Sequence, residues 1–280
     1  MAIDNLADAL SEAGGTYASD DDPDLIRDAL PFSLKLIEAL LEETPRHRGL
    51  LEAAASGFTQ YAYAFVQQDA DEMEDRDSAR ASALRARARR LYLRARGYGL
   101  RGLETGHDRF EEALRREPAA AVSRITDIED VPLLYWTAAA SGLAIALSKD
   151  DPDMIADVPV VEALIRRALA LDETYDGGAI HEFLINLEGS KPDAMGGSLE
   201  RARLHYQRAV ELSKGRRAQP FVTFAEVVSV RNQDRAGFVS LLERALEIDV
   251  NATPEWRLAN LVMQRRARWL LGRADLLFVE

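Results

Sequence analysis

Three glycines in Gly97-Tyr98-Gly99-Leu100-Arg101-Gly102 match the G-x-G-x-x-G pattern of dinucleotide-binding loops. Such a loop must join a strand to a helix, because its backbone amides have to face the pyrophosphate. Here an arginine-rich helical stretch precedes the glycines. We therefore interpret them as glycines at the end of a helix, and we predict no dinucleotide site.

His181-Glu182 resembles the start of a zinc-protease motif, in which a second histidine follows one helical turn later. Ile185 stands at that position, and no two of the four histidines (47, 107, 181 and 205) have the spacing of metal ligands. The chain has no cysteine, which excludes disulfides and thiolate metal sites. It also lacks a G-x-S-x-G motif. We predict no metal, no cofactor and no catalytic residue, and we retain His181 as a candidate for capping a helix or lining a groove or partner contact.

Arginines are dense between Arg85 and Arg101 and could form a helix that binds a polyanion. The formal net charge of the chain is -12, which argues against nucleic acid or an anionic membrane as a general partner. We therefore predict that these arginines pair with neighbouring acidic side chains.

Aromatic residues are crowded in two stretches. Phe58, Tyr61 and Phe65 follow one helical stripe and are explained by core packing, whereas Tyr63 falls off that stripe. In Leu133-Leu134-Tyr135-Trp136, the Trp136 side chain likewise points away from the main stripe. Tyrosine and tryptophan suit binding surfaces because each combines a large apolar body with one polar group. As candidates for lining a ligand-binding or partner-binding groove or pore we select Phe58, Tyr61, Tyr63, Tyr135, Trp136 and His181.

The elements that position these residues are predicted to be helices. The 280 residues are 47% hydrophobic and dominated by Ala, Leu, Arg and Glu, which favour helices. No apolar run reaches the roughly 20 residues of a membrane span. Helix starts are marked at Asp22-Pro23, Asp151-Pro152 and Thr253-Pro254, where an N-cap acceptor precedes proline. Short linkers favour antiparallel neighbours.

Two sequence repeats indicate a duplication. DDPDLIRD (21–28) and DDPDMIAD (150–157) share six of eight residues, and RARRLYLRA (87–95) and RARLHYQRA (201–209) share six of nine. Pro31 and Pro159 follow the first pair at similar distances. We interpret the chain as one helical domain, 1–280, with homologous halves at about 20–148 and 150–272.

A smaller unit is visible inside the halves. Ala202, Tyr206 and Ala209 have the small–aromatic–small spacing of the second helix of a tetratricopeptide repeat (TPR). Similar spacing recurs in two further triplets: Val161, Ile165, Ala168 and Phe238, Leu242, Ala245. The predicted fold is an all-α superhelix of stacked antiparallel helix pairs with degenerate TPR-like repeats.

The same stretches resemble a known family. DALPFSLKLIEALL, GFTQYAYAFVQ, LYLRARGYGLRGLE, DVPLLYWTAAASG, YDGGAIHEFLINLEG and PEWRLANLVMQRRARWLL are similar to the T component of TPR-associated TRAP transporters, the TatT family. The resemblance extends from about residue 3 to the C-terminus. It implies a non-enzymatic periplasmic lipoprotein that forms homotrimers, associates with the solute-binding subunit of the transporter, and binds or conducts a hydrophobic ligand.

The N-terminal MAIDNLADALSEAGG lacks the basic and apolar regions of a signal peptide. Family members usually have a lipoprotein signal and an acylated cysteine upstream of the matching stretch, so the resemblance implies lipid anchoring of the native protein. One alternative is a cytosolic TPR adaptor that binds a peptide tail of a partner. Another is an enzyme whose site is assembled from distant residues, although no set of acid, base or metal ligands in the sequence indicates one.

Overall fold

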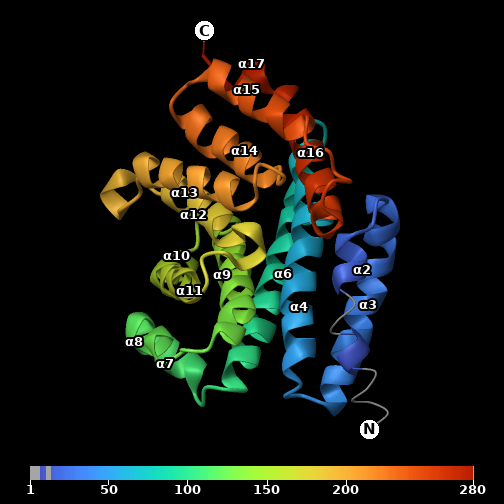
Figure 1. The fold of residues 1–280 in the computed structure, drawn as a ribbon, viewed down its shortest axis with the longest axis vertical. Helices are drawn as coiled ribbons and strands as arrows, with labels where there is room; N and C mark the ends of the chain where they lie inside the picture. Colours follow the sequence, from blue (N-terminus) through green and yellow to red (C-terminus); the bar gives the residue numbers. More distant parts are fainter. Residues whose placement is uncertain (1–6, 11–13, 280) are drawn as a thin grey trace. The chain divides into compact units, whose positions relative to one another are not determined.

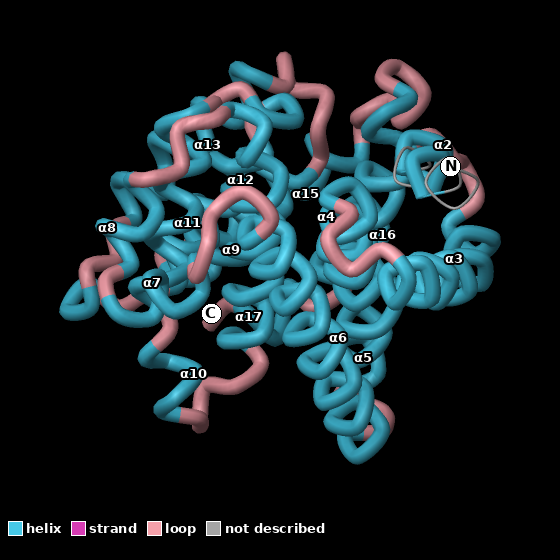
Figure 2. Tube along the Cα trace, turned by 90° about the horizontal axis from the view of Figure 1, so that it is seen from below, coloured by secondary structure: helices cyan, strands magenta, loops and turns pink. Residues whose placement is uncertain are grey.

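The structure, a computed structural model, describes residues 7–10 and 14–279, and within these ranges it contains helices, turns and loops but no strand (Figures 1 and 2). The predicted all-α class is confirmed. Residues 1–6, which include the start of the family resemblance, lie outside the described residues, as do residues 11–13 and 280. Nowhere in the described ranges is a helix both long and apolar enough to cross a membrane.

In the first part of the chain the helical elements are α2 (Gly14–Ala18), α3 (Pro23–Glu43), α4 (Arg48–Tyr61), η1 (Ala62–Gln67), α5 (Gln68–Met73), α6 (Ser78–Glu104), α7 (Phe110–Arg116), α8 (Pro118–Ser123), η2 (Ile128–Asp130), α9 (Val131–Ala146), α10 (Pro152–Ala156) and α11 (Val158–Leu171). The later elements are η3 (Tyr175–Gly177), α12 (Ala179–Ser190), η4 (Asp193–Met195), α13 (Leu199–Leu212), α14 (Gln219–Phe224), η5 (Ala225–Ser229), α15 (Arg235–Leu246), η6 (Pro254–Trp256), α16 (Arg257–Leu271) and α17 (Ala274–Leu277).

The chain divides into two compact units. The first comprises the described residues of Met1–Gly15 and Asp24–Asp172, and the second comprises Thr16–Pro23 and the described residues of Glu173–Glu280. The predicted seam between the homologous halves, at residues 148–150, lies inside the first unit, where α9 and α11 pack against each other. The single domain, its two halves and the superhelical repeat remain predictions.

Helix α9 forms the centre of the first unit. Its sequence, VPLLYWTAAASGLAIA, is apolar on every side, which is typical of a helix surrounded by other elements. It packs against α4, α6 and α11, and α4 and α6 run side by side (Figure 1). Burying this helix requires close neighbours, and its many alanines permit them.

The three glycines of the G-x-G-x-x-G match lie inside α6, not at its end, so the prediction that they end a helix is wrong. A Cβ atom on Gly99 would lie 2.1 Å from Thr137 Oγ1, and one on Gly102 would lie 2.5 Å from Leu133 Cδ2. Thr137 and Leu133 belong to α9. Gly99 and Gly102 therefore allow α6 to approach α9 closely. Among the described residues no strand precedes them, which a dinucleotide-binding loop would require.

The predicted helix starts are found, but the two DDPD stretches fold differently. Asp151 caps α10 by accepting a hydrogen bond from the Met154 amide, as predicted. Pro23 begins α3, which continues through Pro31 as a single helix of 21 residues, whereas the second copy is split into α10 and α11. Thr253 precedes the 3₁₀ turn η6, but its side chain makes no capping hydrogen bond.

The second unit is built from helices that pack with their sequence neighbours. Helix α12 packs against α13, and α15 packs against both α14 and α16. The three residue triplets with TPR-like spacing lie in α11 of the first unit and in α13 and α15 of the second, and all of their residues are buried except Tyr206, which is half-buried. Small residues such as Ala202 and Ala209 on α13 let these helices approach closely.

Candidate functional site

Five of the six predicted site residues belong to the first unit, and His181 belongs to the second. Phe58, Tyr61 and Tyr135 are buried, with exposed fractions of 4%, 8% and 8%. Tyr63 and Trp136 are half-buried. The helical pattern of the sequence separates these last two from the core stripe, and their burial agrees with that distinction. Whether any of the six contacts a ligand or a partner stays a prediction.

The structure joins some of the predicted aromatics in pairs. Tyr135 and Trp136 contact each other edge to face on α9, with ring centroids 4.9 Å apart. Tyr61 packs against Phe65 at 5.8 Å. Phe58 instead stacks on Tyr98 of α6, with centroids 5.9 Å apart and ring planes at 11°. Sequence reasoning did not select Tyr98, although it lies within the G-x-G-x-x-G match.

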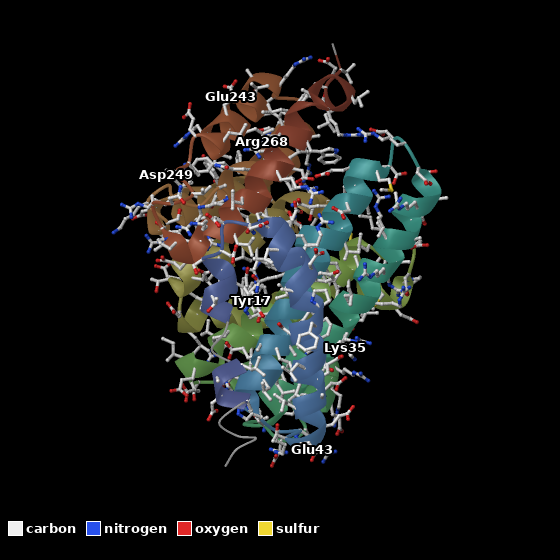
Figure 3. All side chains as sticks on the ribbon, turned by 90° about the vertical axis from the view of Figure 1, so that its right-hand side faces the viewer. Tyr17, Lys35, Glu43, Glu243, Asp249 and Arg268 are labelled. Atoms are coloured by element: carbon white, nitrogen blue, oxygen red, sulfur yellow. The ribbon has the colours of Figure 1, made fainter. Side chains whose placement is uncertain are left out.

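Tyr98 connects this aromatic stack to a hollow between α3 and α6. We call it the α3–α6 groove; it is open to solvent, and its volume is about 470 Å³. Lys35, which lies on α3 and is labelled in Figure 3, is one of the residues that line the groove. The groove is lined by Lys35, Glu38, Leu41, Glu42, Pro45, Arg94, Tyr98 and Arg101.

A hydrogen-bonded carboxylate lies in the groove. Glu38 accepts hydrogen bonds from Lys35 Nζ (2.6 Å) and Tyr98 Oη (2.7 Å), and Arg94 lies 3.5 Å away. Burial by itself raises the pKa of Glu38, but these hydrogen bonds and the charge of Arg94 outweigh it and hold the pKa below its usual range. Burial and the bond to Glu38 raise the pKa of Tyr98 to about 12.

Cationic side chains cover the aromatic rings at this groove. The guanidinium of Arg94 lies 5.4 Å from the ring centroid of Phe58, and that of Arg101 lies 5.4 Å from the ring centroid of Tyr98. Arg101 also donates a hydrogen bond to the Pro45 carbonyl. The groove is therefore polar and charged, and it is better suited to a polar group than to an apolar solute.

The arginines between Arg85 and Arg101 largely pair with acids, as predicted. Their ion pairs are Arg85 with Asp71 and Glu74, Arg89 with Asp151, Arg94 with Glu38, and Arg96 with Asp157. Acids on neighbouring elements thus neutralise these four arginines, which argues against a polyanion site on this helix.

Two π-helical segments were not predicted. Tyr63 lies in one of them, η1, which interrupts the helix between α4 and α5. The other, η5, follows α14 in the second unit and contains Glu226, which Arg266 of α16 contacts with two guanidinium nitrogens. Single π turns are rare and frequently occur at functional sites, because the extra residue re-aims the side chains that follow. No sequence signal marks either segment.

In the second unit, His181 lies on α12 with an exposed fraction of 5%. Its Nδ1 lies 2.9 Å from Nδ1 of His205 on α13. Burial lowers the pKa of His181, although the nearby Glu173 carboxylate opposes this shift. Residues 181 and 205 do not have the sequence spacing of metal ligands, so the packing of α12 on α13 alone brings them together.

Next to His181, a buried ion pair joins α12 to the segment before α14. Glu182 is 1% exposed and accepts hydrogen bonds from Arg217 Nε (2.6 Å) and Nη2 (2.8 Å). Asp176 also accepts from Arg217, at 3.1 Å, and from the indole nitrogen of Trp256, at 2.9 Å. Sequence reasoning missed this network. Across the residues that the structure describes, no group of three or more His, Cys, Asp or Glu side chains is arranged to hold a metal ion.

Tyr98→Phe keeps the aromatic stack but removes the hydrogen bond to Glu38. We expect it to lower the free energy of unfolding by about 1–2 kcal/mol near neutral pH, because a donor to a charged acceptor is lost. The raised pKa of about 12 means that the folded chain holds the Tyr98 proton more tightly than the unfolded chain, whose value is near 10.0. The difference between wild type and variant should be constant from neutral pH up to pH 10.0 and shrink above it. It should also shrink in acid, where Glu38 becomes protonated and no longer accepts as a carboxylate. Urea titrations at several pH values measure this, and equal stability of the two proteins at neutral pH would contradict the prediction.

Comparison with known proteins gives the family. The sequence model of the TRAP transporter T-component matches residues 19–278. A protein of Treponema pallidum (strain Nichols), described only as uncharacterized, is 31% identical over 277 residues, which cover 97% of this chain and 85% of the relative. The match includes both compact units and nearly all of the described helices. The chain therefore belongs to the family of TRAP transporter T components, as the resemblance in its sequence indicated.

Proposed function

We propose that this protein acts in the periplasm, where it associates with the solute-binding subunit of a TRAP transporter. The observation that supports this proposal is the family match over residues 19–278, which makes the chain an accessory component of such a transporter. The same match favours this role over a cytosolic TPR adaptor and over an enzyme.

The exposed side of α3 is the first surface to examine for the subunit contact. Phe32 is 74% exposed and Leu25 is 57% exposed, and they are two helical turns apart on this helix. Exposed aromatic residues next to charged groups are typical of protein interfaces. Lys35, one turn from Phe32, belongs to the neighbouring α3–α6 groove.

Association is tested with the natural full-length protein and the solute-binding subunit of its own transporter. We expect them to co-purify, and we expect Phe32→Ser to weaken the complex. Leu204→Ser is the matched control, because Leu204 is similarly exposed (58%) but lies on α13. Failure of the two folded proteins to associate at tens of micromolar would refute the subunit contact. Equal binding by the Phe32 and Leu204 variants would refute only the α3 surface.

We further propose that the protein forms a homotrimer that binds an apolar ligand, and the half-buried Tyr63 and Trp136 are the first of the predicted aromatic residues to test for contact with it. Light scattering should then give three times the 31.1 kDa mass of one chain, and a monomer at high concentration would exclude the trimer. A fluorescent fatty acid should quench Trp136. Trp136→Phe should remove most of this signal while Trp269→Phe, at the other end of the sequence, keeps it.

Periplasmic location and lipid anchoring are tested on the natural gene product. Fractionation of cells should place it with the periplasmic and membrane-associated proteins, with detergent required for its release. Recovery in the cytosolic fraction would instead support the adaptor.

A further inference from the structure

Two histidines of the second unit meet where α12 packs against α13. His181 Nδ1 and His205 Nδ1 are 2.9 Å apart, and the two rings are inclined at 42°. A neutral imidazole has one donor nitrogen and one acceptor nitrogen. One Nδ1 therefore donates to the other, and both Nδ1 lone pairs would face the same place if the donor ring adopted its other neutral tautomer, with the proton on Nε2.

The surroundings of His181 resemble those of a metal-ligating histidine. Its side chain is 6% exposed, and its other nitrogen, Nε2, lies 3.5 Å from Glu173 Oε2. Histidine ligands usually have a carboxylate or carbonyl next to the nitrogen that does not bind the metal, which fixes the ring and its tautomer. Burial also favours the neutral imidazole, the form that binds metals.

The geometry points to a site for a late first-row divalent cation, such as Zn²⁺, Ni²⁺ or Cu²⁺, held between Nδ1 of His181 and Nδ1 of His205. Metal–nitrogen bonds of about 2.0–2.1 Å place two ligands of a tetrahedral site about 3.3 Å apart, so the pair must open by a few tenths of an ångström. His205 is only half-buried, so we expect its ring to make this movement and to admit water.

Water completes the coordination in this proposal, because the described residues provide no cluster of three donor side chains. Such a site is open and weaker than a closed structural zinc site. Arg208 reduces the affinity further: it pairs with Glu173 and with Glu211, and its charge lies near His181. Imidazole ligands favour Cu²⁺ over Ni²⁺ and Zn²⁺ in the usual order.

The test is calorimetric titration of the full chain, first freed of metal with a chelator, with Ni²⁺ or Zn²⁺ chloride. We expect one saturable site per chain, and a rise in melting temperature with metal. His205→Ala should weaken binding at least about tenfold and remove the rise, since it deletes one of two ligands. His205 is half-buried, so this variant is expected to fold; His181→Ala is avoided because His181 is buried.

Two further variants test whether metal binding depends on the His181–His205 pair. Glu173→Gln should weaken binding about tenfold through the orientation of His181, without removing a ligand. His47→Asn, in the first unit, should bind like wild type. The proposal is overturned if wild type shows no saturable binding, or if folded His205→Ala binds as tightly as wild type.

Discussion

Glu182→Ala is expected to lower the free energy of unfolding of the second unit by about 3–5 kcal/mol. The reason is that the substitution leaves the Arg217 guanidinium buried without the Glu182 carboxylate. The Arg217 side chain is 7% exposed and donates to both oxygens of Glu182. Without that carboxylate the buried positive charge loses two short hydrogen bonds, whereas the contacts with Asp176 and with the face of Trp256, 5.2 Å away, remain. Urea unfolding followed by circular dichroism measures the loss.

The control for Glu182→Ala is an exposed ion pair of the same unit. Glu211 pairs with Arg208 but its side chain is 70% exposed. Glu211→Ala should therefore cost less than about 1 kcal/mol, because water screens and replaces the interaction. The double substitution of Glu182→Leu with Arg217→Met should be closer to wild type than either single change, since it leaves no buried charge without its partner. Asp176 loses Arg217 in this variant, but its side chain is 42% exposed and it keeps the hydrogen bond from Trp256. A loss below about 1 kcal/mol for Glu182→Ala would contradict the prediction.

Gly99→Ala is expected to lower the free energy of unfolding of the first unit by about 1–3 kcal/mol. The added Cβ would lie 2.1 Å from Thr137 Oγ1, 3.1 Å from its Cβ and 3.3 Å from its Cα. Rotating the hydroxyl away does not solve the clash, because the other two atoms remain and Oγ1 would lose its 2.6 Å hydrogen bond to the Leu133 carbonyl. The α6 and α9 backbones must separate.

Gly97→Ala is the matched control, on the same helix and two residues away. A Cβ on Gly97 has no heavy atom within 4 Å apart from its own helix and immediate neighbours. Alanine there should raise the free energy of unfolding by about 0.5–1 kcal/mol, because it restricts the unfolded backbone and favours the helix. The two substitutions are thus expected to have opposite signs in the same urea titration. Stabilisation by both substitutions would show that Gly99 is not a point of close helix approach.

The sequence by itself determined the helical class and many of the helix starts. These properties depend on neighbours along the chain: helix-forming residues and a capping acceptor such as Asp151 before a proline. The excess of acids indicated that the α6 arginines would find partners, but the partners themselves, such as Asp151 for Arg89 and Asp157 for Arg96, come from distant parts of the chain. It also separated Tyr63 and Trp136 from the buried stripe, since helical periodicity alone indicates which side chains share a face. The long motifs were specific enough to indicate the family, because likeness along a stretch of sequence does not depend on how the helices pack.

Local sequence patterns did not predict the structure correctly at places where two helices pack against each other. The motif around Gly99 is the same whether it ends a helix, binds a phosphate or faces Thr137, and only the packing of α6 on α9 selects among these. The two DDPD stretches are nearly identical, yet one begins a helix that continues through Pro31. The His181–His205 contact, the Glu182–Arg217 pair and the groove behind Tyr98 each join residues from different elements. Their distances depend on which helix faces are buried against each other, and the packing of the whole core decides which faces those are.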